Sequence, residues 1–257
     1  ILSYTAADIR YAESADGITW SNDQSVQNGS VPIITGPGGA DWNRGSYGPA
    51  DMLYNPSAAN SGTDWTFTMY YDGTTGGEER IGLAFSSDGI TWTGYDGDND
   101  GKADPVLEGT FVSGDWDYNF VSRATILKKS NNSYEMWYSG GNGNMQDGIG
   151  YATSTNGITW IRQPRIFSKT DGLSWRSSRT YCPMVILDGS TYKMWYAGVG
   201  SGNYSIGYAT GDDPTAVKLR SFKAINPQSR VEWLLAGVAL MVIALGATFR
   251  RIKHPGA

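Results

Sequence analysis

One short motif recurs three times along the chain. It reads ADGITW at residues 15–20, SDGITW at 87–92 and TNGITW at 155–160, and the runs IRYAES, IGLAFSS and IGYATST precede the three copies. A fourth run of that kind, IGYATGD, occupies residues 206–212. Recurrence at intervals of several dozen residues indicates repeated structural units, so the architecture follows from the unit rather than from any single residue.

Alignment of the copies extends the unit upstream. A strand rich in methionine and aromatic residues appears as FTMYYDG (67–73), YEMWYSGG (134–141) and YKMWYAG (192–198). Apolar strands precede these as PADMLY, SRATILK and CPMVILD, and each of them follows a tryptophan, which is Trp42, Trp116 or Trp175. Period-two alternation, aromatic residues and flanking Gly, Asn and Asp predict β-strands, and we include DGITW as the last strand of the unit. Four short antiparallel strands per unit are typical of a β-propeller blade.

This order of strands resembles the repeats of the five-bladed propellers that include arabinanases, levansucrases and invertases. The resemblance covers most of residues 1–222 and implies an all-β, glycosidase-like propeller. Three units are nearly complete, and the first begins in mid-blade without an inner strand. Because propellers close by pairing strands from their two ends, we expect a segment to be missing at the N-terminus; an irregularly closed ring is the alternative.

Composition excludes several classes of function. The net charge is -5, and no basic patch lies among the aromatic residues of the repeats. This charge pattern argues against binding of nucleic acid. Cys182 is the only cysteine, which excludes a disulfide framework, and its apolar setting predicts a buried structural thiol. The only histidine, His254, is close to the C-terminus, so no histidine-dependent triad or metal site can form in the propeller. Carboxylate chemistry of the glycosidase kind remains.

The C-terminal region predicts a membrane anchor. Residues 233–249 carry no charge, and Arg250, Arg251 and Lys253 follow at once. The nineteen residues 231–249 are near the short end of what spans a bilayer at about 1.5 Å per residue. A buried core helix is the alternative, but a propeller has no interior groove for one. The pattern also resembles bacterial C-terminal sorting signals.

The predicted organisation is therefore a propeller ectodomain over 1–222, a linker over 223–230, a transmembrane helix over 231–249 and a basic tail over 250–257. The positive-inside rule places the tail in the cytoplasm and the propeller outside, in the periplasm or the extracellular space. Basic residues also occupy the other flank, but those nearest to the span favour this orientation.

The sequence DGDNDGKAD predicts a loop that binds Ca²⁺. Oxygen ligands on alternate residues can converge on one hard cation, and Gly101 at the sixth position permits the sharp turn. Leu107 stands where an EF-hand has its last Glu, so the loop is more similar to those of dockerin-type and thrombospondin-type repeats. A solvated acidic turn is the alternative to a structural calcium site. The predicted metal-site residues are Asp96, Asp98, Asp100, Lys102 and Asp104.

In the families that the chain resembles, acids project into the central channel from the start of the inner strands. Asp51 in SYGPADMLYN falls on such a position, and the repeat alignment places Ala124 and Met184 at the corresponding positions. One acid cannot supply both general acid and base catalysis, each of which contributes about two to four orders of magnitude. We therefore expect Asp51 to be a hydrogen-bonding residue of the channel rather than a catalyst, and we expect no turnover of arabinan, fructan or mannoside.

Aromatic and guanidinium groups recur where the inner strands begin, and such groups bind sugars by stacking and by bidentate hydrogen bonds. The alternative is packing within the fold, and repetition of the tryptophan in every unit favours that interpretation. The candidate ligand-binding residues are Trp42, Arg44, Trp116, Arg123, Trp175, Arg176 and Arg179.

Two functions compete on these grounds. The first, which we favour from the sequence, is a non-catalytic, membrane-anchored scaffold whose C-terminal helix contacts other membrane subunits. The second is a cell-surface protein that binds or cleaves glycans with channel carboxylates. Transmembrane neighbours around residues 233–249 would favour the first function, and a second channel carboxylate near Asp51 would favour the second.

Overall fold

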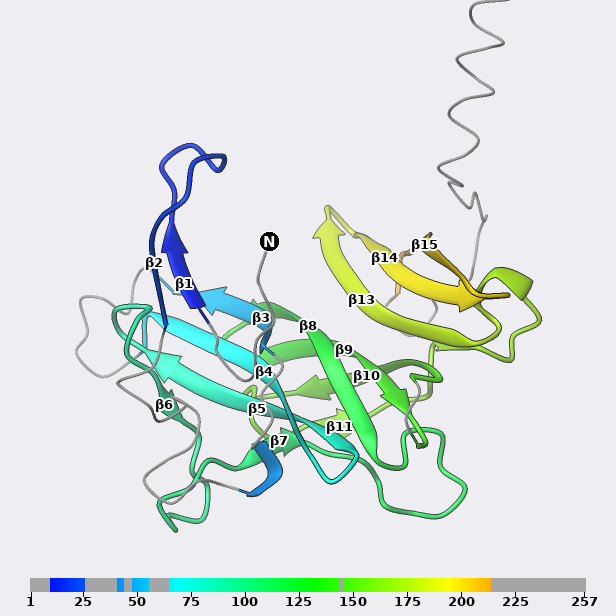
Figure 1. The fold of residues 1–257 in the computed structure, drawn as a ribbon, viewed down its shortest axis with the longest axis horizontal. Helices are drawn as coiled ribbons and strands as arrows, with labels where there is room; N and C mark the ends of the chain where they lie inside the picture. Colours follow the sequence, from blue (N-terminus) through cyan, green and yellow to red (C-terminus); the bar gives the residue numbers. More distant parts are fainter. Residues whose placement is uncertain (1–9, 26–40, 44–47, 56–64, 144–145, 214–257) are drawn as a thin grey trace, which may run out of the picture.

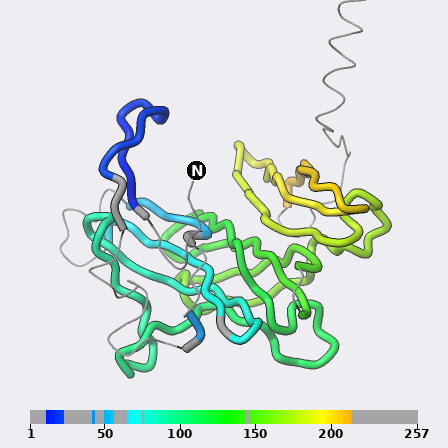
Figure 2. The backbone as a smooth tube through the Cα atoms, viewed as in Figure 1, coloured from blue at the N-terminus to red at the C-terminus, as the bar shows by residue number. Residues whose placement is uncertain are grey.

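The computed structural model describes residues 10–25, 41–43, 48–55, 65–143 and 146–213. Their strands form successive blades that follow one another in sequence order (Figures 1 and 2). The only described helices are two single 3-10 turns, η1 (Asp41–Asn43) and η3 (Ser174–Arg176). The all-β prediction is confirmed, and the sheets are consistent with a propeller of the glycosidase type.

Four blades can be distinguished in the described residues. The first blade contains β1 (Arg10–Glu13) and β2 (Ser21–Ser25). The second contains β3 (Gly48–Tyr54), β4 (Phe67–Thr75), β5 (Glu78–Ser86), β6 (Thr93–Gly94) and β7 (Pro105–Leu107). The third contains β8 (Phe120–Ser130), β9 (Ser133–Gly141), β10 (Gly148–Ser154), β11 (Ile161–Arg162) and β12 (Phe167–Ser168). The fourth contains β13 (Arg179–Asp188), β14 (Thr191–Gly200) and β15 (Asn203–Gly211).

Antiparallel pairing within the blades follows the repeat alignment. The inner strands β3, β8 and β13 each pair with the methionine-aromatic strand, which pairs in turn with the IGYA-type strand. The second and third blades share one hydrogen-bonded sheet only through a single parallel pair between Glu79 and Phe120. In three blades the residue after the motif tryptophan pairs at the same position, as Ser21 with Glu13, Thr93 with Phe85 and Ile161 with Thr153. Trp20, Trp92 and Trp160 are therefore equivalent, as predicted.

The DGITW motif itself is a turn, which corrects our expectation of a strand there. In the second blade the Asp88 Oδ1 accepts hydrogen bonds from the N–H groups of Ile90 at 2.8 Å and Thr91 at 2.7 Å. The Ser86 hydroxyl also donates to this oxygen, and Gly89 adopts a φ of 79° that suits glycine. Asp16 and Asn156 make the same contacts in the neighbouring repeats. Backbone donors are satisfied by the side chain here, so the ladder begins only after the tryptophan.

The tryptophan upstream of each inner strand packs inside its own blade. Trp42 stacks on Tyr71 with ring centroids 5.7 Å apart, and a Cβ at Gly73 would come within 2.6 Å of its ring. Trp116 with Gly140 and Trp175 with Gly198 repeat this close approach. Glycine leaves room for the flat ring against the strand, which explains why the sequence repeats both residue types.

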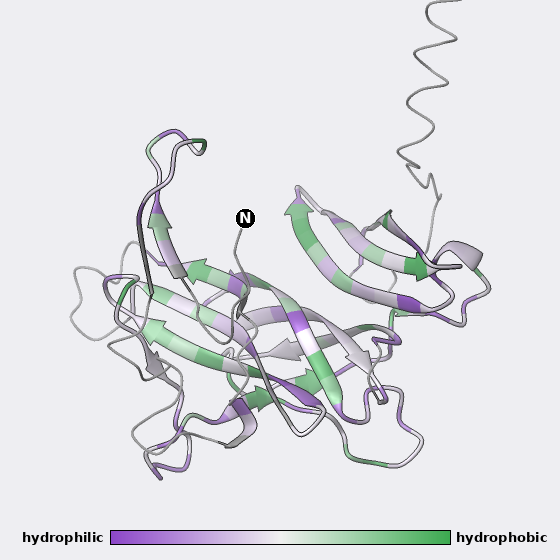
Figure 3. Cartoon of the chain, in the orientation of Figure 1, coloured by the Kyte–Doolittle hydropathy of each residue, from purple (hydrophilic) through white to green (hydrophobic). Residues whose placement is uncertain are grey.

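Apolar faces between successive blades make up the core, and apolar residues run through the strands of each blade (Figure 3). Trp137, Ile149 and Tyr151 of the third blade pack against Val185 and Met194 of the fourth. This stacking fixes the inner strands side by side, which brings the ends of β3, β8 and β13 to one central region.

The predicted linker, transmembrane helix and basic tail lie outside the described residues, as does Arg44. Within the part of the chain that is described, no helix is long and apolar enough to cross a membrane. The number of blades in the closed ring stays a prediction.

Candidate functional site

The inner strands of three blades border a cavity of about 670 Å³. Its apolar lining comes from Ala50 of β3 and from consecutive residues of β8 and β13, within 124–127 and 183–186. The polar side chains that line it are Asp51, Asp72, Arg123, Thr125 and Cys182. This volume lies within the range of about 300–1,000 Å³ that small-molecule sites occupy.

Asp51 joins the second blade to the third. Its Oδ2 accepts a hydrogen bond from the Ile126 N–H of β8 at 2.6 Å, and its Oδ1 accepts one from the Met52 N–H at 2.8 Å. Burial raises the pKa of the Asp51 carboxyl, and the two backbone donors oppose that rise. Both carboxylate oxygens of Asp51 thus satisfy backbone donors.

Asp72, in β4, is a second cavity carboxyl that the sequence analysis missed. It is 7% exposed, and its Oδ1 accepts a hydrogen bond from the Arg123 N–H at 2.7 Å. Among the described residues, nothing hydrogen-bonds to Oδ2. Burial raises the pKa of Asp72 to about 7; the Arg123 N–H opposes this rise and the nearby Glu79 carboxylate adds to it. The Asp72 carboxyl therefore titrates far above the usual range of an aspartate.

The repeat alignment held a signal for Asp72. Its counterparts in the third and fourth blades are Ser139 and Ala197, so an acid stands where the other two blades have a small residue. Ser139 Oγ accepts the Cys182 N–H at 2.8 Å, which is the same contact one blade further on. The position serves to satisfy a backbone donor of the next blade, and a serine suffices for that.

Arg123 and Cys182 occupy equivalent bulges in β8 and β13. Their φ angles of 54° and 51° lie in the left-handed region, which non-glycine residues rarely adopt. Such backbone conformations cluster at functional sites. The Arg123 Nη1 donates to the Cys182 sulfur at 3.3 Å, and burial raises the pKa of the Cys182 thiol. Cys182 is only half-buried and lines the cavity, whereas its sequence setting predicted a buried residue.

The bulges also correct the repeat alignment by one residue. Asp51 pairs with Tyr70, and the residues that pair at the same place in the next blades are Thr125, opposite Trp137, and Met184, opposite Trp195. Thr125, not Ala124, is therefore the counterpart of Asp51. Its hydroxyl donates to the Pro183 carbonyl at 2.7 Å, so it too joins its blade to the next.

Among the candidate ligand-binding residues that the structure describes, Arg123 alone lines this cavity. Trp42, Trp116 and Trp175 lie against their own blades, as described above. Arg176 is fully buried, where it donates to the Ser168 carbonyl at 2.7 Å and to the Asp171 carboxylate at 3.0 Å. Arg179 begins β13 outside the cavity lining.

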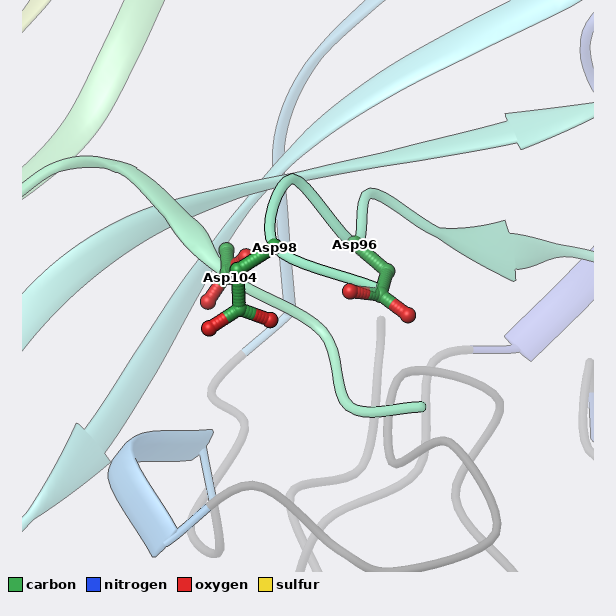
Figure 4. A group of neighbouring side chains, drawn as sticks. All are labelled: Asp96, Asp98 and Asp104. Atoms are coloured by element: carbon green, nitrogen blue, oxygen red, sulfur yellow. The ribbon is translucent and has the colours of Figure 1, made fainter. Parts of the chain in front are cut away.

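The acidic loop between β6 and β7 gathers three of its four predicted carboxylates. Oxygens of Asp96, Asp98 and Asp104 lie within 4.8 Å of one another (Figure 4). Asp100 is outside this group and forms an ion pair with Lys102 at 3.8 Å. Three carboxylates on a short loop fit a hard cation such as Ca²⁺. The Ala103 carbonyl accepts the Trp42 Nε1–H at 2.6 Å, which ties the loop to the core of the second blade.

Solved structures with similar folds include glycoside hydrolases. A thermostable family-43 glycoside hydrolase has a TM-score of 0.56 at 14% identity, over 86% of this chain and 66% of that one. A family-130 glycoside hydrolase, described as targeting β-1,2 mannosidic linkages in Candida mannan, has a TM-score of 0.56 at 20% identity. The match covers 84% of this chain and 60% of that hydrolase. A fructofuranosidase from Schwanniomyces occidentalis, complexed with fructose, has a TM-score of 0.54 at 16% identity. The match covers 87% of this chain and 40% of the fructofuranosidase.

The fold is that of these glycosidase propellers. At such low identity the similarity concerns the fold alone, and the chain spans less than two thirds of the length of each of these proteins. In sequence, the uncharacterized protein Rv1502 of Mycobacterium tuberculosis is 34% identical over 88 residues, which are 32% of this chain and 28% of that protein. No family model matches the chain.

Proposed function

We propose that this propeller is a glycan-binding protein that holds a sugar unit in the cavity between its inner strands. The observation that carries the proposal is that two carboxyls, Asp51 and Asp72, and the Arg123 guanidinium line one cavity of about 670 Å³. A cavity with apolar walls and a few convergent polar groups is the usual form of a small-molecule site. A second channel carboxylate is also the feature by which the sequence distinguished a glycan function from a scaffold.

The two carboxyls have different roles in this proposal. Asp72 keeps Oδ2 for a ligand hydroxyl, and near neutral pH it can donate or accept a hydrogen bond because its pKa is about 7. Asp51 has both oxygens engaged by backbone N–H groups, so it is poorly placed to activate water or attack a sugar. Binding without turnover is therefore the expected activity, in line with the expectation from the sequence.

The test is calorimetric titration of the intact protein with arabino-, fructo- and manno-oligosaccharides. The informative variant is Asp72→Ser, because Ser139 already makes the equivalent backbone contact in the third blade. Loss of a hydrogen bond to a charged or acidic group should weaken binding by about tenfold or more. Asp188→Ser, at the exposed end of β13, is the matched control and should bind like the wild type. Unchanged affinity in Asp72→Ser would contradict the proposal.

The uncharged residues 233–249, followed by Arg250 and Arg251, support a membrane anchor for this binding protein. We include such an anchor in the proposal, with the propeller outside the cytoplasm and the helix in contact with other membrane subunits. Alkaline extraction of membranes should leave the full chain in the pellet and release a chain that ends at residue 230. Recovery of the full chain in the soluble fraction would rule the anchor out.

We also assign a structural Ca²⁺ to the acidic loop, on the basis of the gathered carboxylates of Asp96, Asp98 and Asp104. Because the loop is tied to Trp42 of the second blade, the ion would stabilise the blade rather than take part in ligand binding.

A further inference from the structure

A second cavity, of about 330 Å³, lies between the second and third blades. It borders the C-terminal ends of β3 and β8, whereas the central cavity borders residues nearer the start of these strands. No residue lines both cavities. We call this second cavity the interblade groove; the residues that matter for its chemistry are Tyr54, Trp65, Phe85, Lys128, Tyr134 and Asn156.

Exposed aromatic rings form one side of the interblade groove. Trp65 is 43% exposed and stacks on Phe85 with ring centroids 5.9 Å apart and planes 21° from parallel. Tyr54 is 64% exposed and its ring lies 5.2 Å from that of Phe67. Each ring is supported from behind by another ring and keeps a face in solvent. A flat apolar face of this kind is suited to stacking against the C–H groups of a sugar ring.

Polar groups without a partner of their own occur beside these rings. The Asn156 Oδ1 accepts hydrogen bonds from Ser154, Ile158 and Thr159, which fixes the orientation of the amide. Its Nδ2 and the Tyr134 hydroxyl form no hydrogen bond with any described residue. The equivalent turn positions in the first two repeats hold Asp16 and Asp88, which offer no N–H there.

The corresponding place between the third and fourth blades is closed by a polar network. Tyr192, the counterpart of Tyr134, is 4% exposed; it donates to Glu135 at 2.9 Å and accepts from Lys129 at 2.7 Å. At the groove, Thr68 and Asn55 stand where that network has Glu135 and Lys129. Without the acid and the lysine, the ion pair cannot form and the tyrosine hydroxyl stays available. The interblade groove is thus a specific departure from the repeat.

We propose that the interblade groove is a second carbohydrate site, which binds an acidic sugar unit such as a uronate. The ring stacks on Trp65, the hydroxyls meet Asn156 and Tyr134, and the carboxylate pairs with Lys128. Lys128 is the only charged side chain among the described residues that line the groove, and its Nζ already lies 5.6 Å from the Tyr134 ring centroid. The carboxylate of a bound uronate would therefore pair with Lys128, and no acidic side chain among the described lining residues would repel it.

The test uses the intact protein and two probes of equal length, an oligogalacturonate and a manno-oligosaccharide, in calorimetric titrations. Trp65→Ala and Lys128→Gln should each weaken oligogalacturonate binding by about tenfold, while Trp65→Phe, which keeps a stacking face, should bind within about threefold of the wild type. Added salt should weaken binding in the wild type and much less in Lys128→Gln. Tyr204→Ala, an exposed aromatic of the fourth blade, is the control and should have no effect.

Asp72→Ser separates this site from the central cavity, because it should leave oligogalacturonate binding unchanged. The proposal is overturned if oligogalacturonate does not bind, if it binds Asp72→Ser no more tightly than the neutral probe does, or if Trp65→Ala and Lys128→Gln bind it like the wild type. Loss of oligogalacturonate binding in Asp72→Ser alone would place the ligand in the central cavity instead and would also overturn it.

Discussion

Trp137 and Trp195 occupy the same position in successive blades, yet Trp137 is completely buried and Trp195 is 36% exposed. Each pairs across the sheet with a tyrosine of the IGYA-type strand, Tyr151 or Tyr208. The fourth blade covers the face of the third that carries Trp137, whereas no described blade packs on the equivalent face of the fourth. The same residue is therefore core in one repeat and surface in the next.

This difference predicts unequal costs for two identical substitutions. Trp137→Ala should lower the free energy of unfolding by about 3–5 kcal/mol, because it leaves a large cavity between two blades. Trp195→Ala should cost about 1 kcal/mol or less, since much of its ring is already in solvent. Urea denaturation of both variants measures the difference. Equal costs would mean that the exposed face of the fourth blade is covered in solution.

Asp72 predicts a pH dependence of stability. Its pKa is raised to about 7 in the fold, so the fold favours the protonated carboxyl and the contribution of this group to stability is lost as the pH rises towards 7. Between about pH 5.5 and 8 the unfolding free energy of the wild type should fall, by roughly 2 kcal/mol, and that of Asp72→Ser should stay level. The only histidine is His254, so few other groups titrate in this window. Parallel slopes in the two proteins would show that Asp72 is not the group responsible.

The Asp51 hydrogen bonds predict the effect of an isosteric change. Asparagine keeps one acceptor oxygen but turns an NH₂ group towards one of the two backbone donors, Met52 or Ile126. Asp51→Asn should therefore lower the unfolding free energy by about 1–3 kcal/mol. Thermal unfolding of Asp51→Asn is the measurement. A midpoint equal to that of the wild type would argue against the double backbone contact.

The DGITW turn predicts that aspartate and asparagine are interchangeable there. Asp88→Ala removes the acceptor of two backbone N–H groups and should cost about 1 kcal/mol, whereas Asp88→Asn should be nearly neutral at pH 7 because Asn156 makes the same bonds. These backbone donors lower the pKa of Asp88 to about 2, so its contribution is lost as the pH falls through that value. Denaturant curves at pH 7 and at about pH 2 compare the three proteins. A large loss in Asp88→Asn at pH 7 would contradict this account of the turn.

The acidic loop predicts a calcium effect that depends on three of its aspartates. Ca²⁺ at a hundred times its dissociation constant should stabilise the fold by about 2.7 kcal/mol, seen as a rise in the unfolding midpoint that a chelator reverses. Asp98→Asn should abolish most of that rise. Asp100→Asn should keep it, because Asp100 pairs with Lys102 outside the gathered carboxylates. No heat of binding in calorimetry would remove the calcium site.

Much of the fold was predictable because a repeat reports the same local pattern several times. The equivalence of Trp20, Trp92 and Trp160 follows from recurrence, and period-two alternation identifies the strands around them. The turn nature of DGITW was missed, although Ser86, Asp88 and Gly89 have the side chains that such a turn uses. The apolar residues of the motif follow a pattern that is also typical of a strand. Only the hydrogen bonds to the aspartate side chain distinguish the turn from a strand.

The candidate site could be predicted only in part. The sequence by itself determined that the propeller has carboxylates but no histidine, and it identified Asp51 and Arg123. Only the tertiary structure decided that Asp72 faces the same cavity and that Thr125, not Ala124, is the counterpart of Asp51. The reason is physical: left-handed bulges at Arg123 and Cys182 shift the register, and the packing of one blade on the next determines which face of a strand is buried.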